Sequence, residues 1–285
     1  MKRQDFRFFD RMRVRWAEVD MQKIVFNGHY LMYFDTAVAG YWRALAMPYH
    51  AAMDLLQGDL FVRKATLEYL GSARYDDLCD VGLRCDHIGK SSLRFVAALF
   101  LGETLLVHGE LIYVFADPVA QASRPVPDAL RELMLGFERG ESMLRLQLGG
   151  WSELGESARA VRQAVFVDEQ KIDASLASDE ADLDAVTAVA FNRFEMPVAT
   201  GRLLPHAPGV WKLSRLAVLQ AVRGGGIGRQ LLDSLMRAAR ERDATRVLLH
   251  AQQSAADFYA RAGFAPQGAA FDESGVTHIE MVRTL

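Results

Sequence analysis

Three consecutive glycines, residues 224–226, stand where the sequence pattern changes from a strand to a helix. Residues 211–218 predict a strand, and apolar residues from Ile227 to Ala239 recur at helical spacing. Glycine lets backbone N–H groups crowd around a ligand that a Cβ atom would exclude. A helix N-terminus adds unpaired N–H donors and a partial positive charge. This stretch therefore predicts an anion site, most naturally for phosphate.

The apolar residues of the preceding strand change phase. Trp211 and Leu213 share one face, but the next apolar pair, Leu216 and Val218, is shifted by one residue. A β-bulge near residues 214–215 would restore the phase, and bulges often occur beside active sites. We expect this bulge to splay the neighbouring strands and to leave backbone donors free.

The strand, bulge, glycine loop and helix resemble the acyl-CoA site of the GNAT N-acetyltransferase superfamily. The loop reads Arg-x-x-Gly-x-Gly at Arg223, Gly226 and Gly228, which is neither a P-loop nor a Rossmann fingerprint. The resemblance implies that the loop holds the CoA pyrophosphate, and the alternative is a glycine-rich turn without a ligand. The residues expected to bind acetyl-CoA are Leu216, Ala217, Val218, Arg223, Gly224, Gly225, Gly226, Ile227, Gly228 and Arg229.

A short helix around Tyr259 resembles the GNAT element whose tyrosine faces the CoA sulfur. The resemblance implies that Tyr259 is a general acid that protonates the leaving thiolate. The alternative is a core tyrosine whose hydroxyl is hydrogen-bonded. Ser254 is expected to cap this helix and Gly263 to end it. The sequence leaves the general base open among Glu169, Glu273, His278 and Glu280.

The rest of the second half alternates strand and helix patterns. Residues 144–148 predict a first strand, residues 159–170 a helix, and residues 179–184 an acidic turn. A hairpin over 185–193 and 196–204 and a buried strand over 246–251 complete the expected elements. Residues 143–285 as a whole resemble GNAT, most closely a bacterial subgroup that shares the patterns at 165–170, 199–203 and 273–278.

The first half predicts one buried helix and about five strands. Residues 31–45 are apolar on nearly every side, which is typical of a buried helix. Met12, Val14 and Trp16 alternate with arginines, which predicts a strand with an arginine face that is either solvated or binds CoA phosphates. Further strands are expected at 60–70, 78–88, 91–101 and 104–116, and a short helix at 125–137.

This order resembles the hotdog fold of the 4-hydroxybenzoyl-CoA thioesterase family over residues 10–135, most specifically at 20–30. The resemblance implies that Asp20 supplies the carboxylate for thioester hydrolysis, as nucleophile or as base for water. The backbone N–H near Asn27 would polarise the thioester carbonyl, and Asn27 and His29 would position water or substrate. The alternatives are a helix-capping aspartate and a core histidine.

One residue of the hotdog motif departs from the family. Lys23 stands where the family normally has glycine. A glycine there could serve a close approach or an unusual φ angle. The lysine therefore puts the hydrolytic activity in doubt more than the fold.

Composition excludes several other classes of protein. The formal net charge is −3, and neither half is basic, which argues against a nucleic-acid partner. Cys79 and Cys85 lack metal-ligand spacing and predict buried thiols in a reducing compartment. The opening residues lack the apolar core of a signal peptide, and no stretch approaches a membrane span. We expect a cytoplasmic protein without a metal cofactor.

The sequence thus predicts two folds in tandem. We expect an α+β hotdog domain over 1–138, a linker near 136–142 and an α/β GNAT domain over 143–285. The expected protein is bifunctional, hydrolysing an acyl-CoA and transferring an acetyl group from acetyl-CoA to an amine. It would form a homodimer or homotetramer through the hotdog domain. The alternatives are an active GNAT half with a hotdog domain used for dimerisation, and a non-catalytic acyl-CoA sensor.

Overall fold

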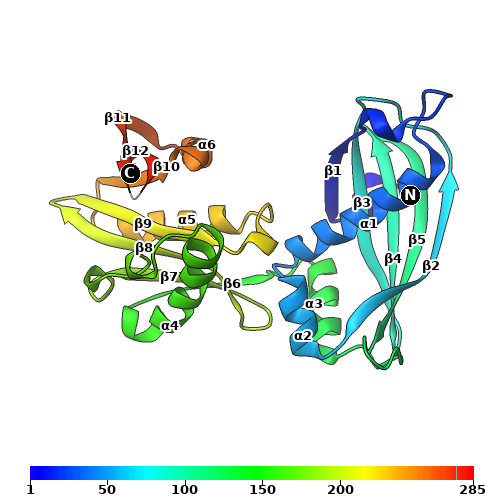
Figure 1. Cartoon of the computed structure of the whole chain (residues 1–285), viewed down its shortest axis with the longest axis horizontal. Helices are drawn as coiled ribbons and strands as arrows, with labels where there is room; N and C mark the ends of the chain where they lie inside the picture. The colour runs from blue at the N-terminus through cyan, green and yellow to red at the C-terminus, as the bar shows by residue number, and fades with distance from the viewer. Residues whose placement is uncertain (274) are drawn as a thin grey trace. The chain divides into compact units, whose positions relative to one another are not determined.

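A computed structural model describes residues 1–273 and 275–285 of the chain. The chain divides into two compact units, Met1–Met143 and Leu144–Leu285 (Figure 1). Ser274, which falls within the pattern at 273–278, lies outside the described residues. No helix in the described part of the chain is long and apolar enough to cross a membrane.

The first unit is an antiparallel sheet with a long helix against one face (Figure 1). The helix is α1 (Asn27–Ala44), and two shorter helices, α2 (Tyr49–Leu56) and α3 (Asp128–Glu138), accompany it. The sheet order is β1-β3-β4-β5-β2. Its strands are β1 (Phe8–Arg13), β2 (Asp59–Tyr69), β3 (Leu78–Ile88), β4 (Ser92–Leu101) and β5 (Thr104–Ala116).

Helix α1 buries one face only. Phe34, Ala37 and Tyr41 are fully buried, whereas Leu31 and Met32 are 39% and 41% exposed. The prediction of a helix buried on all sides was therefore wrong for the outer face. Within this unit the sheet covers a single side of the helix, so its other apolar side chains have nothing to pack against.

The first strand is shorter than its alternating pattern predicted. β1 ends at Arg13, and Trp16 lies in a 3-10 turn, η2 (Trp16–Glu18), where it is 75% exposed. The turn forms because Glu18 accepts a hydrogen bond from the Arg15 backbone N–H at 2.7 Å. Tyr33 of α1 holds the same carboxylate at 2.7 Å. A local capping interaction thus overrides the strand periodicity.

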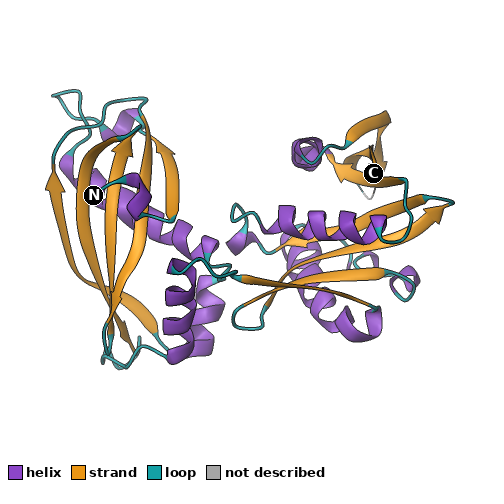
Figure 2. Ribbon diagram, turned by 180° about the vertical axis from the view of Figure 1, so that it is seen from behind, coloured by secondary structure: helices purple, strands orange, loops and turns teal. Residues whose placement is uncertain are grey.

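The second unit is a mixed sheet with the strand order β11-β12-β10-β9-β8-β7-β6. Only β9 and β10 pair in parallel among the described strands. Helices pack on both sides of the sheet (Figure 2). The strands are β6 (Leu144–Gly149), β7 (Val186–Asn192), β8 (Pro197–Ala207), β9 (Val210–Val218), β10 (Arg246–Gln252), β11 (Ala265–Glu273) and β12 (Val276–Thr284); the helices are α4 (Trp151–Arg162), α5 (Ile227–Arg240) and α6 (Ala256–Arg261).

The predicted bulge is confirmed in β9. Thr200 of β8 pairs with Ala217 and Arg202 pairs with Ser214, so two residues of β9 oppose one residue of β8. The extra residue is Arg215, whose φ of 54° lies in the left-handed region. The parallel pairing of β9 with β10 ends at Lys212. The two strands therefore separate just before the bulge.

Other boundaries differ from the sequence predictions. The helix expected at 159–170 begins earlier, as α4, and continues as a π-helix over Gln163–Glu169. The expected linker at 136–142 overlaps the end of α3, because Gly136 and Phe137 are buried on that helix. Ala255, and not Ser254, occupies the N-cap position of α6, without a side-chain cap.

Candidate active sites

The second unit contains a cavity of about 850 Å³ where β9 and β10 separate. The glycine loop and the start of α5 form part of its wall, and α6 and β12 contribute further residues. Strands that diverge leave the facing backbone groups without sheet partners, so a ligand can hydrogen-bond to them. Of the residues predicted to bind acetyl-CoA, those that line the cavity are Leu216, Ala217, Val218, Arg223, Gly224, Gly226, Ile227, Gly228 and Arg229; Gly225 does not line it.

The loop conformation requires glycine at two positions. Gly224 and Gly226 have φ angles of 88° and 79°, which L side chains rarely adopt. No atom lies within 4 Å of where a Cβ atom would stand at either position. Gly226 is the N-cap of α5 and provides no side chain to satisfy the first N–H groups of the helix. These donors are therefore open to an anion.

Both arginines of the loop already have carboxylate partners. Arg223 donates two hydrogen bonds to Glu169, at 2.6 and 2.7 Å, and a third to the Val218 carbonyl at 2.9 Å. Arg229 contacts Asp233 one helical turn later, at 2.9 Å. Glu169, one of the candidate bases, thus orients Arg223 and does not line the cavity.

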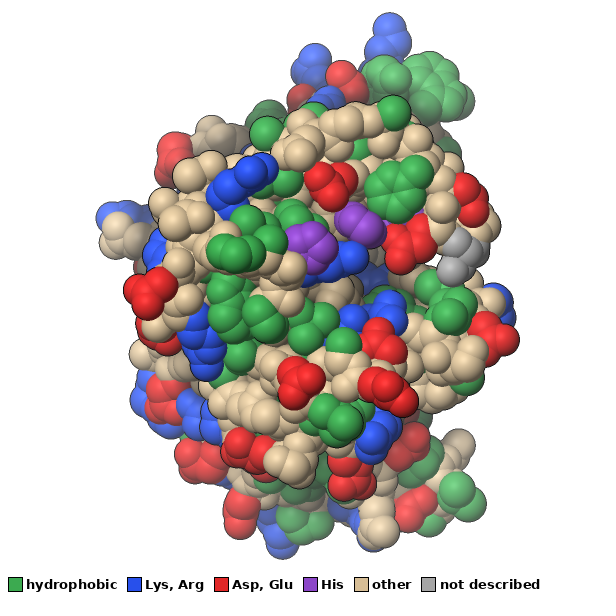
Figure 3. Space-filling view, turned by 90° about the vertical axis from the view of Figure 1, so that its left-hand side faces the viewer, with side chains coloured by type: hydrophobic (Ala, Val, Ile, Leu, Met, Phe, Trp, Pro, Cys, Tyr) green, Lys and Arg blue, Asp and Glu red, His purple; other side chains and the backbone are tan. Residues whose placement is uncertain are grey.

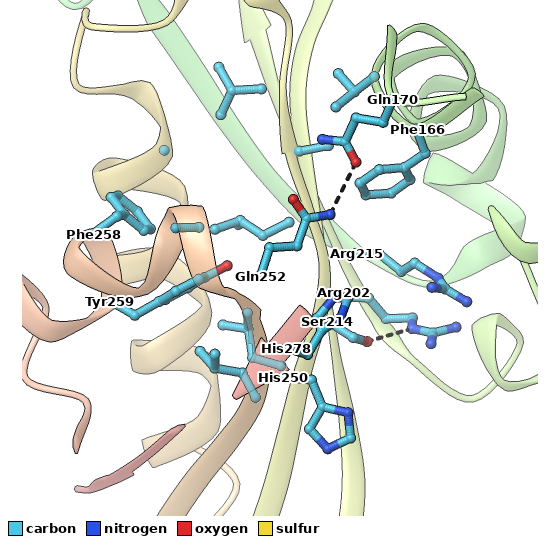
Figure 4. Close-up of a pocket in the computed structure, with 18 of the residues that line it drawn as sticks. Phe166, Gln170, Arg202, Ser214, Arg215, His250, Gln252, Phe258, Tyr259 and His278 are labelled. Atoms are coloured by element: carbon cyan, nitrogen blue, oxygen red, sulfur yellow. Dashed lines mark hydrogen bonds between the residues drawn. The ribbon is translucent and has the colours of Figure 1, made fainter. Parts of the chain in front are cut away.

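Tyr259 lies on α6 and is 9% exposed at the cavity wall. Figure 4 shows its hydroxyl group directed toward the space between α6 and β10. None of the described residues forms a hydrogen bond with this hydroxyl. Burial raises the pKa of Tyr259, so the side chain is a neutral phenol that can donate a proton. Gly263, at φ 85°, ends the α6 region, where the Phe264 N–H bonds to the Tyr259 carbonyl at 3.1 Å.

A network of charges extends from this cavity into the core. Arg162 and Asp182 are 0% and 1% exposed and form a bidentate pair at 2.8 and 3.0 Å. Arg202 reaches Asp182 at 3.1 Å and also binds Asp179. Burial by itself raises the pKa of Asp182, but Arg162 and Arg202 hold it below its usual value.

This network was not predicted from the sequence, in which the acidic segment at 179–184 indicated only a turn. The spacing of residues along α4 could have indicated that Arg162 is buried. Arg162 continues the buried row of Leu154 and Ala158 at intervals of four residues. A charged residue in line with an apolar face needs a buried partner, and the nearest acidic segment supplies it.

Two histidines, His250 and His278, also line the cavity. His278 Nδ1 is 2.8 Å from the Val276 carbonyl, so Nδ1 carries the proton and Nε2 is the basic nitrogen when the ring is neutral. His250 Nδ1 lies 3.1 Å from Glu273, and Nε2 lies 3.8 Å from Glu280. Of the four candidate bases, Glu273 and His278 line the cavity.

The first unit has a smaller cavity, of about 270 Å³, next to the start of α1. Asp20 and Asn27 both line it, together with Tyr30 and Tyr69. His29 does not line it and packs on Phe26, with ring centroids 6.1 Å apart. The structure therefore brings two of the three predicted residues together.

The Asp20 loop is a tight turn in which Lys23 takes a glycine conformation. Lys23 has a φ of 61°, and its N–H bonds to the Asp20 carbonyl at 2.9 Å. The Asp20 side chain accepts a hydrogen bond from the Gln22 N–H at 2.8 Å. Lys23 thus adopts a left-handed backbone conformation that glycine takes freely, at a steric cost of about 1–2 kcal/mol.

Tyr30 and Tyr69 were not among the predicted site residues. The Tyr69 hydroxyl donates to the Asn27 carbonyl at 3.2 Å, and the Tyr30 hydroxyl accepts from the Ala73 N–H at 2.9 Å. Both bonds connect the start of α1 to the end of β2 and the segment after it, which fixes the position of the helix N-terminus. Within residues 1–273 and 275–285, no group of three His, Cys, Asp or Glu residues could hold a metal ion.

Comparison with known proteins assigns each unit to a family. The family model for the acetyltransferase (GNAT) domain matches residues 159–285, and the model for the thioesterase superfamily matches residues 22–108. The Bacillus subtilis protein named Uncharacterized N-acetyltransferase YjcF is 32% identical over 124 residues, which cover 43% of this chain and 87% of that relative.

The chain belongs to the GNAT acetyltransferases, with a hotdog thioesterase domain fused in front.

Similarity to proteins of both kinds extends over nearly the whole of each relative. The Acyl-CoA thioester hydrolase YbgC of Escherichia coli O157:H7 is 26% identical over 123 residues, covering 42% of this chain and 89% of the relative. A solved acyl-CoA N-acyltransferase from Pseudomonas aeruginosa is 29% identical and covers 50% of this chain and 99% of its own, with a TM-score of 0.46. Both resemblances predicted from the sequence are confirmed, and so is the fold class.

Proposed function

We propose that the GNAT domain transfers an acetyl group from acetyl-CoA to an amine in a ternary complex. The observation that carries this proposal is that one cavity joins the glycine loop, the separated strands β9 and β10, and the buried hydroxyl of Tyr259. An anion site, an open strand edge and a proton donor are the groups that a CoA thioester requires.

The phosphates and the thioester arm would occupy different parts of this cavity. The pyrophosphate would accept hydrogen bonds from the backbone N–H groups of the loop and of the first turn of α5. Arg229 would add positive charge, and Arg223 would do so by sharing or leaving Glu169. The pantetheine arm would pair with the exposed backbone edge of β9 at Leu216–Val218.

The chemical step needs one base and one acid. A neutral amine nitrogen attacks the acetyl carbonyl carbon, and the C–S bond breaks as the C–N bond forms. The departing sulfur takes the proton of the Tyr259 hydroxyl. The amine loses its proton to a base in the cavity, for which the Nε2 atom of His278 is our choice because its Nδ1 is held by a carbonyl.

We propose for the hotdog domain the hydrolysis of an acyl-CoA thioester. Asp20 and Asn27, the first residue of α1, line the same small cavity, which would place a carboxylate near a carbonyl polarised by the helix N-terminus. Asp20 would attack the carbonyl directly or take a proton from the attacking water. In the direct route the C–S bond breaks as Asp20 forms a mixed anhydride with the acyl group, and water then cleaves this anhydride and restores the carboxylate. In both routes the products are the free acid, whose new oxygen comes from water, and CoA as the free thiol.

Exposed apolar side chains around this cavity support a dimer or tetramer through the hotdog domain. Phe26 and Tyr69 at its edge are 53% and 49% exposed, and Leu31 and Met32 of α1 are also exposed. A second copy would cover these apolar side chains and complete the site. Light scattering of the full chain should show a dimer or tetramer, and a monomer at micromolar concentration would contradict this proposal.

Thiol release from a panel of acyl-CoAs without an amine tests the hydrolase, with Asp20→Asn as the variant. Asp54→Asn is the matched control, because Asp54 is exposed on α2 of the same unit. Release that is lost only in Asp20→Asn supports hydrolysis. No release with any acyl-CoA would overturn the hydrolase proposal and favour a hotdog domain that serves dimerisation.

Product detection with acetyl-CoA and a panel of amines tests the transferase, with Tyr259→Phe as the variant. N-acetylated product that depends on Tyr259 supports the proposal. Acetyl-CoA binding without product from any amine, together with no thiol release, would favour the acyl-CoA sensor.

A further inference from the structure

Arg215 is the strained residue of the candidate acetyltransferase site. Its φ of 54° is unusual for a long side chain, and holding a residue in this region is energetically unfavourable. The bulge that imposes this conformation directs Arg215 to the cavity, where it lies beside Arg202 (Figure 4). Backbone strain of this kind persists where the surrounding structure fixes the conformation, and it is common at binding and catalytic sites.

Most of the guanidinium of Arg215 has no partner. Within the described residues it makes one hydrogen bond, from Nη2 to Asp179 at 3.0 Å. Its Nε is buried and lacks an acceptor altogether. A buried donor without an acceptor is costly, and native structures rarely leave one unexplained.

Two neighbours add donors to the same end of the cavity. Lys212 is the last residue of β9 that pairs with β10, and the described residues form no ion pair with its ammonium group. Ser214 accepts a hydrogen bond from Arg202 Nε at 3.0 Å, which leaves its own hydroxyl hydrogen for a ligand. Figure 3 shows a face of the molecule where histidine and basic side chains gather beside a hollow.

The charges that line this end do not cancel. Three cations, Arg202, Lys212 and Arg215, line the cavity together with two carboxylates, Asp179 and Glu273, which leaves one positive charge when the histidines are neutral. The buried pair of Arg162 and Asp182 behind them adds one charge of each sign. Glu273 contacts His250, and no ion pair joins it to the three cations.

We propose that Arg215, Lys212 and Ser214 bind a carboxylate of the acyl acceptor, so that the acceptor is an amine that carries a carboxylate, as in an amino acid. The inference rests on the proposed acetyl transfer. A monoanion would neutralise the spare charge, and a planar carboxylate matches the paired donors of a guanidinium.

The basic groups lie away from the parts of the cavity that we assign to CoA and to the proton donor. Tyr259, the proposed acid, is on α6, whereas Arg202 and Arg215 lie on the opposite side of β9 and β10 in the close-up view (Figure 4). The phosphates of CoA would occupy the glycine loop, which β9 reaches after the bulge. The basic groups before the bulge and in it, Lys212 and Arg215, are therefore left for the second substrate.

The test compares amino acids with their C-terminal amides as acceptors for the full-length protein. Wild type should prefer the acid over the amide, measured as the ratio of kcat/KM. In Arg215→Gln and, separately, Lys212→Met, this ratio should fall by about 10- to 100-fold, as expected for lost hydrogen bonds to a charged group. Arg240→Gln, an exposed arginine on α5, is the control and should leave the ratio unchanged.

Binding separates this inference from the proposed reaction. Calorimetry with CoA present should show tighter binding of the amino acids than of their amides, and the difference should shrink in both variants. That result without any acetylated product would support the carboxylate site and contradict the transferase. Equal binding of acids and amides, or a stronger preference for phosphorylated amines, would overturn the inference. If Arg215→Gln fails to fold, as shown by circular dichroism, Lys212→Met decides between the outcomes.

Discussion

The two candidate sites differ in how far one chain completes them. The cavity of the GNAT domain measures about 850 Å³ and is walled by strands, helices and a buried charge network of the same domain. The cavity of the hotdog domain measures about 270 Å³ and has exposed aromatic residues at its edge. The first site is supported from its own core, whereas the second, in our proposal, needs another copy of the chain.

The largest effect is expected from removing Arg162, the buried arginine that pairs with Asp182 behind the GNAT cavity. Arg162→Ala should destabilise the GNAT domain by about 3–5 kcal/mol, because the buried Asp182 loses its bidentate partner and keeps a single contact with Arg202. Differential scanning calorimetry should show a lower transition for this domain and an unchanged one for the hotdog domain. Glu195→Gln, which breaks an exposed pair with Arg145, is the control and should cost less than about 1 kcal/mol.

Equal stability of Arg162→Ala and wild type would show that the network does not support the cavity.

Removing the proposed acid should affect one activity and spare the other. Tyr259→Phe should lower kcat for acetyl transfer by about 10²- to 10⁴-fold without changing thiol release by the hotdog domain. Because burial raises the pKa of Tyr259, its proton is retained as the pH rises. Wild-type transfer should therefore not decline through loss of this proton at about pH 10, where an ordinary tyrosine ionises.

A loss of transfer activity in Tyr259→Phe that is explained by weaker acetyl-CoA binding would contradict the assignment as general acid.

Gly226 of the glycine loop can be compared with Gly268 of β11, because the two glycines have the same φ angle. Gly226→Val should raise the Kd for acetyl-CoA by about 100-fold, because a β-branched residue cannot hold the φ of 79° that opens the helix N-terminus. Gly268→Val is the matched control, since Gly268 has the same φ and equally open surroundings on β11. Calorimetric titration with acetyl-CoA measures both. Similar weakening in the two variants would indicate general strain and not a loop that binds phosphate.

The smallest expected effect concerns the hotdog loop. Lys23→Gly should stabilise the hotdog domain by up to about 1 kcal/mol, since glycine adopts the φ of 61° without a steric cost. Thiol release should stay within about twofold of wild type, because the backbone of the Asp20 turn is the same. A large gain in hydrolysis would show instead that the lysine side chain obstructs the site.

Local patterns were sufficient for much of the fold. The phase change between Leu213 and Leu216 predicted the bulge, because a strand alternates its side chains strictly and any shift needs an extra residue. The glycines at 224–226 predicted the turn into α5 because two of them adopt φ angles that other residues avoid. The family motifs predicted the two folds in tandem.

Periodicity along the chain failed where individual hydrogen bonds and ring contacts decided the structure. Trp16 was expected in a strand, but the carboxylate of Glu18, held by Tyr33, closes a turn there. His29 was expected near Asp20, but the helix rotates it against Phe26. Spacing along the chain determines which residues share a helix face, and it does not determine what that face meets.

The sequence by itself determined the bulge and the glycine loop, because each depends on neighbours within a few residues, and its family motifs indicated the two fold types and Tyr259 as a residue of the same site. Only the tertiary structure revealed the network of Arg162, Asp182 and Arg202, and the unpartnered donors of Arg215. Those charges come from α4, a 3-10 turn and two strands that are separate in the sequence. Electrostatic pairing depends on distance in space, so it emerges once the sheet has brought these elements together.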